Sequence, residues 1–458
     1  MKTRGRRGAD EAPPEPGKGG EAAGGLPWEV LSTGANEQKE SPGQNEGLME
    51  EVASAANLNA AWKRVRENAG APGIDGITIA AFPEYVRARI ETLRQELLAG
   101  TYRPSPLRRA RISKPAGGER LLGIPTVQDR VVQQALLQVL QPILDASFSE
   151  HSYGFRPKRS AHQAVAAAQA YVQEGYDWVV DLDLEAFFDR VNHDRLMSRL
   201  GRRIGDQRVC RIIRGFLRAG VMEQGVLSAT WEGTPQGGPL SPLLANLVLD
   251  ELDGEITRRG LRFVRYADDC NVYVRSERAA TSAFTNLTGF IEGTLKLKVN
   301  RAKSAVARPW ERKFLGFSFT PGRAAKRRIA PKAVAKVKAR IRELTRKGRF
   351  SFQAVMAGLR RYLMGWLGYF RFCQTPSVLA ALEEWTRRRL RCLIWQQWKR
   401  GPRRFAELVK RGADREEAAK LAGSPHGPWH LSRTPLLHQI FSKAWFAAHG
   451  LPAFHVSA

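Results

Sequence analysis

Apolar residues recur along most of this chain with the three-and-four spacing that is typical of amphipathic helices. The spacing predicts helices over residues 128–144 and 194–217, and again within 323–349. Residues 1–48 lack this pattern, because they are rich in Gly, Pro, Glu and Ala and contain few apolar side chains. We therefore expect this N-terminal tail to be disordered.

A period of two, typical of β-strands, replaces the helical pattern in residues 263–274. Two runs of β-branched and aromatic residues flank the adjacent acids Asp268 and Asp269. The pattern predicts a β-hairpin with both carboxylates at its tip. For an isolated Asp-Asp pair, a solvated turn would be the commoner explanation, since Asp is a frequent turn residue.

A second stretch with acids at two-residue spacing changes that balance. Residues 178–189 begin as an apolar strand, place Asp181 and Asp183 on one face of its end, and continue with Phe187 and Phe188. Carboxylates gathered in this way repel one another, so they persist most naturally where a cation neutralises them. Their hard oxygen atoms suit Mg²⁺ that is bridged to substrate phosphates.

Residues 107–125 predict another β-hairpin, with a Gly-Gly tip and with Lys114 and Arg120 nearby. Cations on a hairpin that closes over a triphosphate would neutralise the charge that develops on the leaving pyrophosphate. Solvated basic side chains beside a turn are the alternative explanation.

Charge points to the class of partner. The chain of 458 residues has a formal net charge of +28, and residues 1–51 contribute −4 of it, which leaves +32 on the remainder. Such an excess predicts a polyanionic partner, most naturally nucleic acid, although composition does not separate a polymerase from a ribosomal or chromatin protein. Residues 323–349 hold twelve basic residues and one acid. A helix there would pack with one face and grip a duplex with the other.

The remaining composition bears on location. The four cysteines are scattered without a Cys-x-x-Cys pair, which predicts a reducing compartment and neither disulfides nor a zinc ribbon. No apolar run is long enough to span a membrane, and the basic N-terminal residues lead into acids without an apolar stretch, so we expect no secretory signal there. Residues 350–400 interleave aromatic rings with arginines; these rings could stack on unpaired RNA bases or pack in a helical core.

The two acidic segments, in this order and spacing, resemble the palm motifs of a reverse transcriptase, Asp-x-x-x-x-Phe and Tyr-x-Asp-Asp. The resemblance implies that Asp183, Asp268 and Asp269 are the catalytic, metal-binding carboxylates. It also implies that Phe188 is the aromatic gate that crowds a ribose 2′-hydroxyl. Asp181 falls outside the motif and is interpreted as a support for the metal ligands.

Other segments match the family in the same order. The 107–125 hairpin resembles the fingertip that covers the incoming nucleotide, which implies nucleotide-binding roles for Lys114 and Arg120. Residues 151–160 resemble the family's Ser-x-Gly-Phe-Arg-Pro-x-Arg-Ser segment and imply that Arg156 supports the template or the nucleotide pocket.

Three further segments complete the order. Residues 233–246 resemble the segment that places Gln236 against the nascent base pair, with Gly237 allowing the backbone to approach. Residues 295–304 carry Lys303, a template or primer contact that could also protonate pyrophosphate or be a plain surface lysine. Residues 314–319 resemble the primer grip and contain Gly316.

Over residues 57–445 the chain is identified as similar to bacterial group II intron reverse transcriptases and maturases that lack the HNH endonuclease domain. The implied fold is α+β: a right-hand polymerase with fingers, an antiparallel palm sheet and a helical thumb, followed by an α-helical maturase domain. The implied boundaries are 1–48 for the tail, 49–320 for fingers and palm, 321–350 for the start of the thumb, and 351–458 for its end and the maturase domain.

The resemblance implies RNA-directed DNA synthesis with two Mg²⁺ ions, deoxynucleoside triphosphates, a DNA primer or target and an intron RNA template, together with help in splicing. It further implies a cytoplasmic, nucleoid-associated bacterial protein, possible as a homodimer. Two alternatives stay open: an RNA-binding splicing factor without polymerase activity, and a domesticated reverse transcriptase in phage defence or DNA repair. The intact carboxylates argue against the first, while the catalytic motifs do not separate the second.

Overall fold

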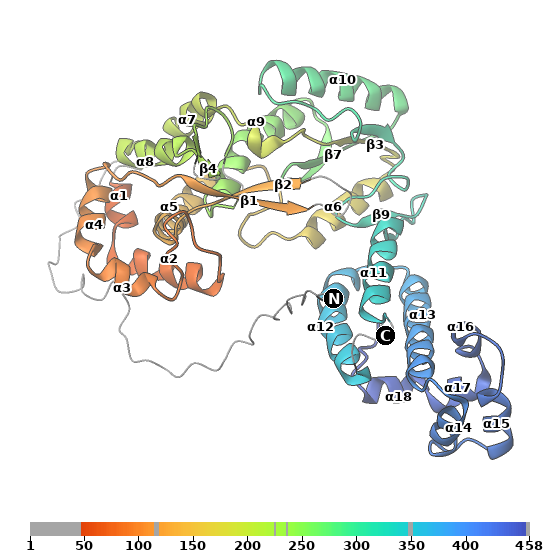
Figure 1. Cartoon of the computed structure of the whole chain (residues 1–458). Helices are drawn as coiled ribbons and strands as arrows, with labels where there is room; N and C mark the ends of the chain where they lie inside the picture. Colours follow the sequence, from red (N-terminus) through yellow and green to blue (C-terminus); the bar gives the residue numbers. More distant parts are fainter. Residues whose placement is uncertain (1–46, 114–118, 224–225, 235–236, 347–350, 455–458) are drawn as a thin grey trace, which may run out of the picture.

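The computed structural model describes residues 47–113, 119–223, 226–234, 237–346 and 351–454. Figure 1 shows a part that contains sheets and a part made of helices alone, with α11 leading from one to the other. The tail predicted to be disordered lies outside the described residues up to position 46. The α+β class predicted from the sequence is confirmed.

The first helices form because each has an apolar stripe that packs on its neighbour. In α2, Ser54 accepts a hydrogen bond from the Asn57 amide as N-cap, and the buried face packs on α5. The elements are α1 (Leu48–Val52), α2 (Ala55–Glu67), α3 (Phe82–Arg87), α4 (Ile90–Leu98), β1 (Leu107–Ser113), β2 (Glu119–Ile124), α5 (Val127–Asp145) and α6 (Ala161–Gln173).

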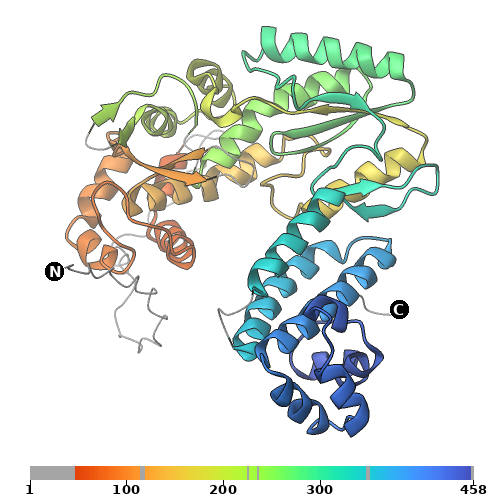
Figure 2. The ribbon, with the colours of Figure 1, turned by 45° about the vertical axis from the view of Figure 1, so that its right-hand side comes forward.

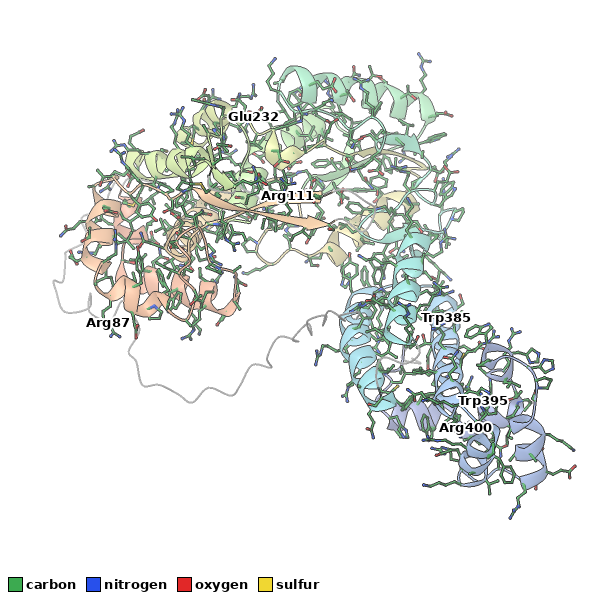
Figure 3. All side chains as sticks on the ribbon, in the orientation of Figure 1. Arg87, Arg111, Glu232, Trp385, Trp395 and Arg400 are labelled. Carbon is green, nitrogen blue, oxygen red and sulfur yellow. The ribbon has the colours of Figure 1, made fainter. Side chains whose placement is uncertain are left out.

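The predicted 107–125 hairpin is confirmed as β1 and β2, which pair antiparallel with Ser113 opposite Glu119. The strands belong to an outer sheet in the order β2-β1-β4-β5, completed by β4 (Val221–Glu223) and β5 (Val226–Ser228). Arg111 on β1 ties three of these strands together, because it pairs with Glu119 on β2 and with Glu223 on β4 (Figure 3).

A second four-stranded sheet, the central sheet, has the order β6-β7-β3-β8. Its alternating residues are buried on both faces: Val180 packs in the core that contains α9 and α10, and Val179 packs in the cluster that contains α6. The strands of this sheet are β3 (Trp178–Leu182), β6 (Arg262–Tyr266), β7 (Asp269–Val274) and β8 (Ala305–Ala307). The helices of the same region are the 3₁₀ helix η2 (Phe187–Asp189), α9 (Ser241–Arg258) and α10 (Glu277–Gly293).

The single helix predicted over 194–217 is wrong in one respect, since the structure has two helices there: α7 (His193–Gly201) and α8 (Gln207–Arg218). Glycine is a poor helix residue, and Gly201 and Gly205 fall at the break. Asp206 then caps α8 by accepting a hydrogen bond from the Arg208 amide (2.9 Å).

The helical part has its own core, built around Leu390, Trp395 and other buried residues. It follows the short sheet of β9 (Phe317–Phe319) and β10 (Arg327–Ile329). Its helices are α11 (Pro331–Leu344), α12 (Phe352–Phe370), α13 (Pro376–Gln397), α14 (Gly401–Val409), α15 (Arg415–Ala422), α16 (Pro428–Leu431), α17 (Pro435–Ile440) and α18 (Lys443–Ala448). The turned view in Figure 2 shows these helices gathered below the sheets.

An aromatic cluster joins the two parts. Gly316 has a positive φ of +83°, and a Cβ there would lie 3.1 Å from the ring of Phe370 on α12. Nearby, the Tyr369 hydroxyl donates to the Leu315 carbonyl (2.7 Å), and His162 on α6 contacts the Tyr369 carbonyl (2.8 Å). The helical part is therefore held against the central sheet by close packing.

Two predicted absences concern residues that the structure describes. The four cysteines are unpaired. Within the described ranges, no helix combines the length and apolar character needed to cross a membrane.

Candidate active site

Three acids meet at one end of the central sheet. Asp183 directly follows β3, Asp268 lies in the turn between β6 and β7, and Asp269 begins β7. The register pairs Leu182 with Cys270, so the next positions, Asp183 and Asp269, stand opposite each other on the same face. The hairpin with carboxylates at its tip is confirmed.

The charge at this end is only partly balanced. The Asp269 side chain reaches solvent in a cleft, but the protein around it removes part of its hydration. This desolvation, followed by repulsion from the neighbouring carboxylates, Asp268 first among them, raises the pKa of Asp269 to about 6. The Lys303 ammonium lies 3.5 Å from a carboxylate oxygen of Asp183, but both side chains are substantially exposed. Solvent weakens such a pair, so negative charge remains at the site.

Asp181, the fourth acid at this end of the sheet, is paired with an arginine. Its carboxylate accepts two hydrogen bonds from the Arg312 guanidinium, at 2.9 and 2.7 Å. Burial raises the pKa of Asp181, and Arg312 counteracts part of that rise. These contacts agree with the interpretation of Asp181 as a support.

The donor chemistry of Asp183, Asp268 and Asp269 fits a divalent cation. Within the described ranges, no three acid, histidine or cysteine side chains already converge as a metal-binding group. The three carboxylates nevertheless come from adjacent strand ends and offer only oxygen donors, and repulsion from Asp268 and Asp183 contributes to the raised pKa of Asp269. A cation would relieve that repulsion, and these are the residues that would hold it.

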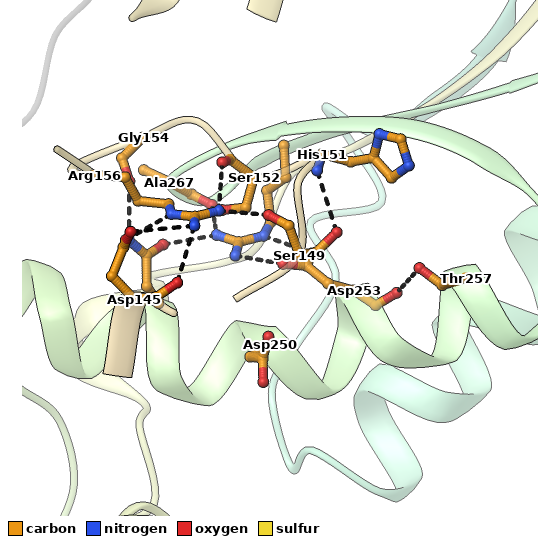
Figure 4. Close-up of polar contacts among 12 residues, drawn as sticks. Asp145, Ser149, His151, Ser152, Gly154, Arg156, Asp250, Asp253, Thr257 and Ala267 are labelled. Carbon is orange, nitrogen blue, oxygen red and sulfur yellow. Dashed lines mark hydrogen bonds and ion pairs between the residues drawn. The ribbon is translucent and has the colours of Figure 1, made fainter. Parts of the chain in front are cut away.

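A buried polar network lies beneath the carboxylate turn (Figure 4). The Arg265 guanidinium is buried and donates to both carboxylate oxygens of Asp253 on α9, at 2.7 and 2.6 Å. It also donates to the Ala267 carbonyl (2.9 Å), directly before Asp268. Burial alone would lower the pKa of Arg265, but Asp253 outweighs burial and raises it. The turn is thus attached to α9 by a permanently charged side chain.

The neighbouring loop is fitted to the same turn. Asn246 on α9 donates to the Gly154 carbonyl (2.9 Å) and accepts from Arg265 (3.0 Å). A Cβ at Gly154 would lie 2.3 Å from the Ala267 amide nitrogen, so no larger residue fits there. Ala267 itself has a positive φ of +56°, an unfavourable conformation that these contacts stabilise. Sequence reasoning missed Arg265, Asp253 and Asn246, although a charged residue inside an apolar strand was a usable signal.

Arg156, which was expected to support the template or the nucleotide pocket, is bonded within this loop, and its predicted role stays a prediction. Its five N–H donors are all taken by protein acceptors: the Asp145 carboxylate and carbonyl and the carbonyls of Ser149 and Ser152. The side chain is 6 % exposed, and Figure 4 shows it directed into this loop. Arg156 therefore holds the loop from inside and has no donor left for direct contact with a template.

A cleft of about 1230 Å³ opens over the carboxylates. Its lining joins the two sheets, because it contains Leu121 and Leu122 of β2 together with Asp183, Asp268, Asp269, Phe188, Gly237 and Lys303. This volume exceeds that of ordinary small-ligand pockets. Five of the predicted site side chains and the predicted glycine Gly237 therefore line the same cleft.

Gly237 lines the cleft, and the remaining predicted residues lie elsewhere or outside the described part of the chain. Gly237 has a φ of +128°, and a Cβ there would lie 2.9 Å from the Gly123 carbonyl of β2, which explains the need for glycine. Gly316 lies at the packing contact with Phe370. Lys114, Gln236 and the side chain of Arg120 fall outside the described part, so their predicted roles stay predictions.

Comparison with known proteins agrees with this site. Residues 112–319 match the family of reverse transcriptases (RNA-dependent DNA polymerases), and residues 334–412 match the maturase-specific domain of group II introns. Protein YkfC of Escherichia coli is 33 % identical over 293 residues, covering 56 % of this chain and 76 % of YkfC. The group II intron-encoded protein LtrA of Lactococcus lactis is 38 % identical over 208 residues, covering 45 % of this chain and 34 % of LtrA.

Among solved structures, a partial Cas6-RT-Cas1–Cas2 complex aligns with a TM-score of 0.36 and 25 % identity, covering 54 % of this chain and 42 % of that one. The sequence matches define the class: the chain belongs to the reverse transcriptase family, whose members are RNA-directed DNA polymerases that use divalent metal ions. Its second matched region makes it a group II intron reverse transcriptase and maturase.

Proposed function

We propose that this protein copies intron RNA into DNA by extending a DNA primer with deoxynucleoside triphosphates, and that it assists splicing by binding the intron. The observation that carries the polymerase proposal is the meeting of Asp183, Asp268 and Asp269 at the floor of the cleft. The region 334–412, matched to the maturase-specific domain, supports the splicing role.

In the proposed reaction the primer 3′-hydroxyl attacks the nucleotide α-phosphorus, a phosphodiester bond forms, and the bond to pyrophosphate breaks. Two Mg²⁺ ions, held by Asp183, Asp268 and Asp269, would supply activation of the nucleophile and charge stabilisation of the leaving group. Arg265 and Asp253 fix the turn that carries Asp268, so the carboxylates are oriented before substrate arrives.

Residues that line the cleft would select the sugar of the nucleotide and supply positive charge. Phe188 lies beside the carboxylates, where its ring would crowd a ribose 2′-hydroxyl. Lys303 is exposed within the same cleft, where its ammonium could neutralise or protonate the departing pyrophosphate. Lys114 and Arg120 would add charge from the 107–125 hairpin.

Each predicted domain has a separate role in this proposal. Residues 49–320 would form fingers and palm, 321–350 the start of the thumb, and 351–458 its end and the RNA-binding maturase domain. DNA binding would place the protein with the bacterial nucleoid. Light scattering during size-exclusion chromatography would test the predicted homodimer.

Primer extension by purified protein on an RNA template with a DNA primer and Mg²⁺ tests the polymerase proposal. Loss of a carboxylate ligand in Asp268→Asn should lower the rate roughly a thousandfold, and chelation of Mg²⁺ should stop it. Asp194→Asn is the matched control, since Asp194 is 81 % exposed on α7. Folded wild-type protein that binds RNA without extending the primer would favour the alternative splicing factor.

A further inference from the structure

A second concave site lies in the helical part, away from the carboxylates. It is a pocket of about 310 Å³ between α13 and the segment that runs through Arg433 into α17. Its lining includes Glu384, Trp385, Arg388, Arg391, Arg433 and His438. Figure 3 shows Trp385 where α13 runs beside α11.

Positive charge dominates this pocket, because three guanidinium groups face one carboxylate. Arg391 is 4 % exposed, donates to the Phe441 carbonyl (3.2 Å) and contacts His438 (2.9 Å). Burial, followed by repulsion from Arg387, lowers the pKa of Arg391 to about 10. Burial and Arg433 likewise lower the pKa of Arg388. An anion in the pocket would relieve this crowding of cations.

Aromatic surface accompanies the charge. The Arg388 guanidinium lies 3.8 Å from the ring centre of Trp429, which is 38 % exposed. Lys338 and Arg342 of α11 lie over the Trp385 ring, at 5.5 and 5.3 Å from its centre. These cations hold Trp385 in place at the pocket wall. The pocket thus combines an aromatic ring that cations contact with several guanidinium groups.

We propose that this pocket binds one unpaired nucleotide of an RNA, with the phosphate on Arg388 and Arg433 and the base against Trp385. The inference rests on the proposed function only in taking RNA as the ligand. Unpaired bases that are splayed from a loop are commonly stacked on aromatic side chains in this way. A pocket of this volume suits one nucleotide and does not admit a duplex.

Glu384 gives the pocket a preference between the two pyrimidines. A carboxylate in the pocket would repel phosphate, but it would accept hydrogen bonds from an exocyclic amino group. Cytosine offers such a donor at N4, and uracil has a carbonyl oxygen in its place. The pocket should therefore favour cytidine over uridine, although the two bases are nearly equal in size.

Binding of the full chain to RNA hairpins tests the proposal. The probes are hairpins with a cytidine loop or a uridine loop and a fully paired RNA of equal length. Arg433→Glu should weaken binding of the cytidine-loop hairpin about tenfold, while the matched Arg415→Glu on exposed α15 should change it less than about twofold. Equal weakening by both variants would overturn the proposal, because general attraction would then explain the binding.

Glu384→Gln tests base selection without removing the pocket. It should reduce the preference for the cytidine loop over the uridine loop, and a wild-type protein without that preference would contradict the assignment of Glu384. Arg433→Glu should also leave the fully paired RNA nearly unaffected. Primer extension on an unrelated template, measured with the same variants, should be unchanged. The binding assay therefore tests the pocket proposal, and primer extension tests the polymerase proposal independently.

Discussion

The ion pair of Arg265 with Asp253 is hidden from solvent, with both side chains 1 % exposed. Removing one partner from such a pair leaves an uncompensated charge. Arg265→Met should therefore lower the free energy of unfolding by about 3–5 kcal/mol. The double variant Arg265→Met, Asp253→Leu should recover most of that loss, because two apolar side chains then replace the pair.

Activity separates positioning from stability in the same variants. The double variant still lacks the donor to the Ala267 carbonyl, so its kcat for primer extension should stay about a hundredfold low with little change in KM. Chemical denaturation and steady-state kinetics measure the two effects. If activity returned together with stability, Arg265 would have only a structural role.

Phe188 is the residue expected to select the sugar. Replacing it by the smaller valine in Phe188→Val opens space beside the carboxylates without changing charge. The preference for dCTP over CTP, measured as a ratio of kcat/KM, should then fall about tenfold or more, because a steric clash with the 2′-hydroxyl is lost. An unchanged ratio would show that another group performs the selection.

At the scale of elements, the start of α5 contains a buried acid that forms no ion pair with any cation among the residues that the structure describes. Asp129 accepts hydrogen bonds from Tyr102 (2.8 Å) and Thr126 (2.6 Å), and burial raises its pKa to about 6. In the unfolded chain the carboxyl titrates near 3.8. Between these values the folded protein keeps a proton that the unfolded chain releases, so stability falls as pH rises and the cost is complete above about pH 6.

This sign gives a measurable expectation for Asp129→Asn, which cannot ionise. Relative to the variant, the wild type should lose about 3 kcal/mol of unfolding free energy as pH rises from 4 to 7. Urea denaturation across that pH range measures the difference. A difference that does not change with pH would contradict the prediction.

At the scale of the whole molecule, the net charge of +28 should favour the binding of nucleic acid. Lys332 and Lys336 lie one turn apart on α11, and both are exposed. If they contact phosphates, Lys332→Gln with Lys336→Gln should lower the slope of log affinity against log salt by about two. Lys410→Gln with Lys420→Gln carries the same charge change on other exposed residues. Equal slopes for both pairs would remove α11 from the interface.

The arrangement of the whole molecule also fixes the position of the helical part relative to the central sheet. Gly316 packs on Phe370, and His162 of α6 contacts the carbonyl of Tyr369, so α12 is held against the central sheet. A duplex leaving the cleft would therefore meet helices whose position is defined by the sheet. Single-residue patterns did not indicate this contact, because its members are far apart along the chain.

By itself, the sequence determined the 107–125 and 263–274 hairpins, the strand that precedes Asp183, the carboxylates at these strand ends and the family. A two-residue period reports which side chains share a face, and Asp183, Asp268 and Asp269 are placed by strand ends and a turn, which are local features. The basic helix within 323–349 is local for the same reason.

Only the tertiary structure decided which polar groups are buried together. Arg156 is basic and lies in a family motif, yet its donors are satisfied inside the protein. Arg265 finds Asp253 and Asn246 only because α9 packs beneath the carboxylate turn. The pocket at Trp385 likewise needs α13 and α17 side by side. Burial and pairing depend on contacts between distant elements, and no local period encodes them.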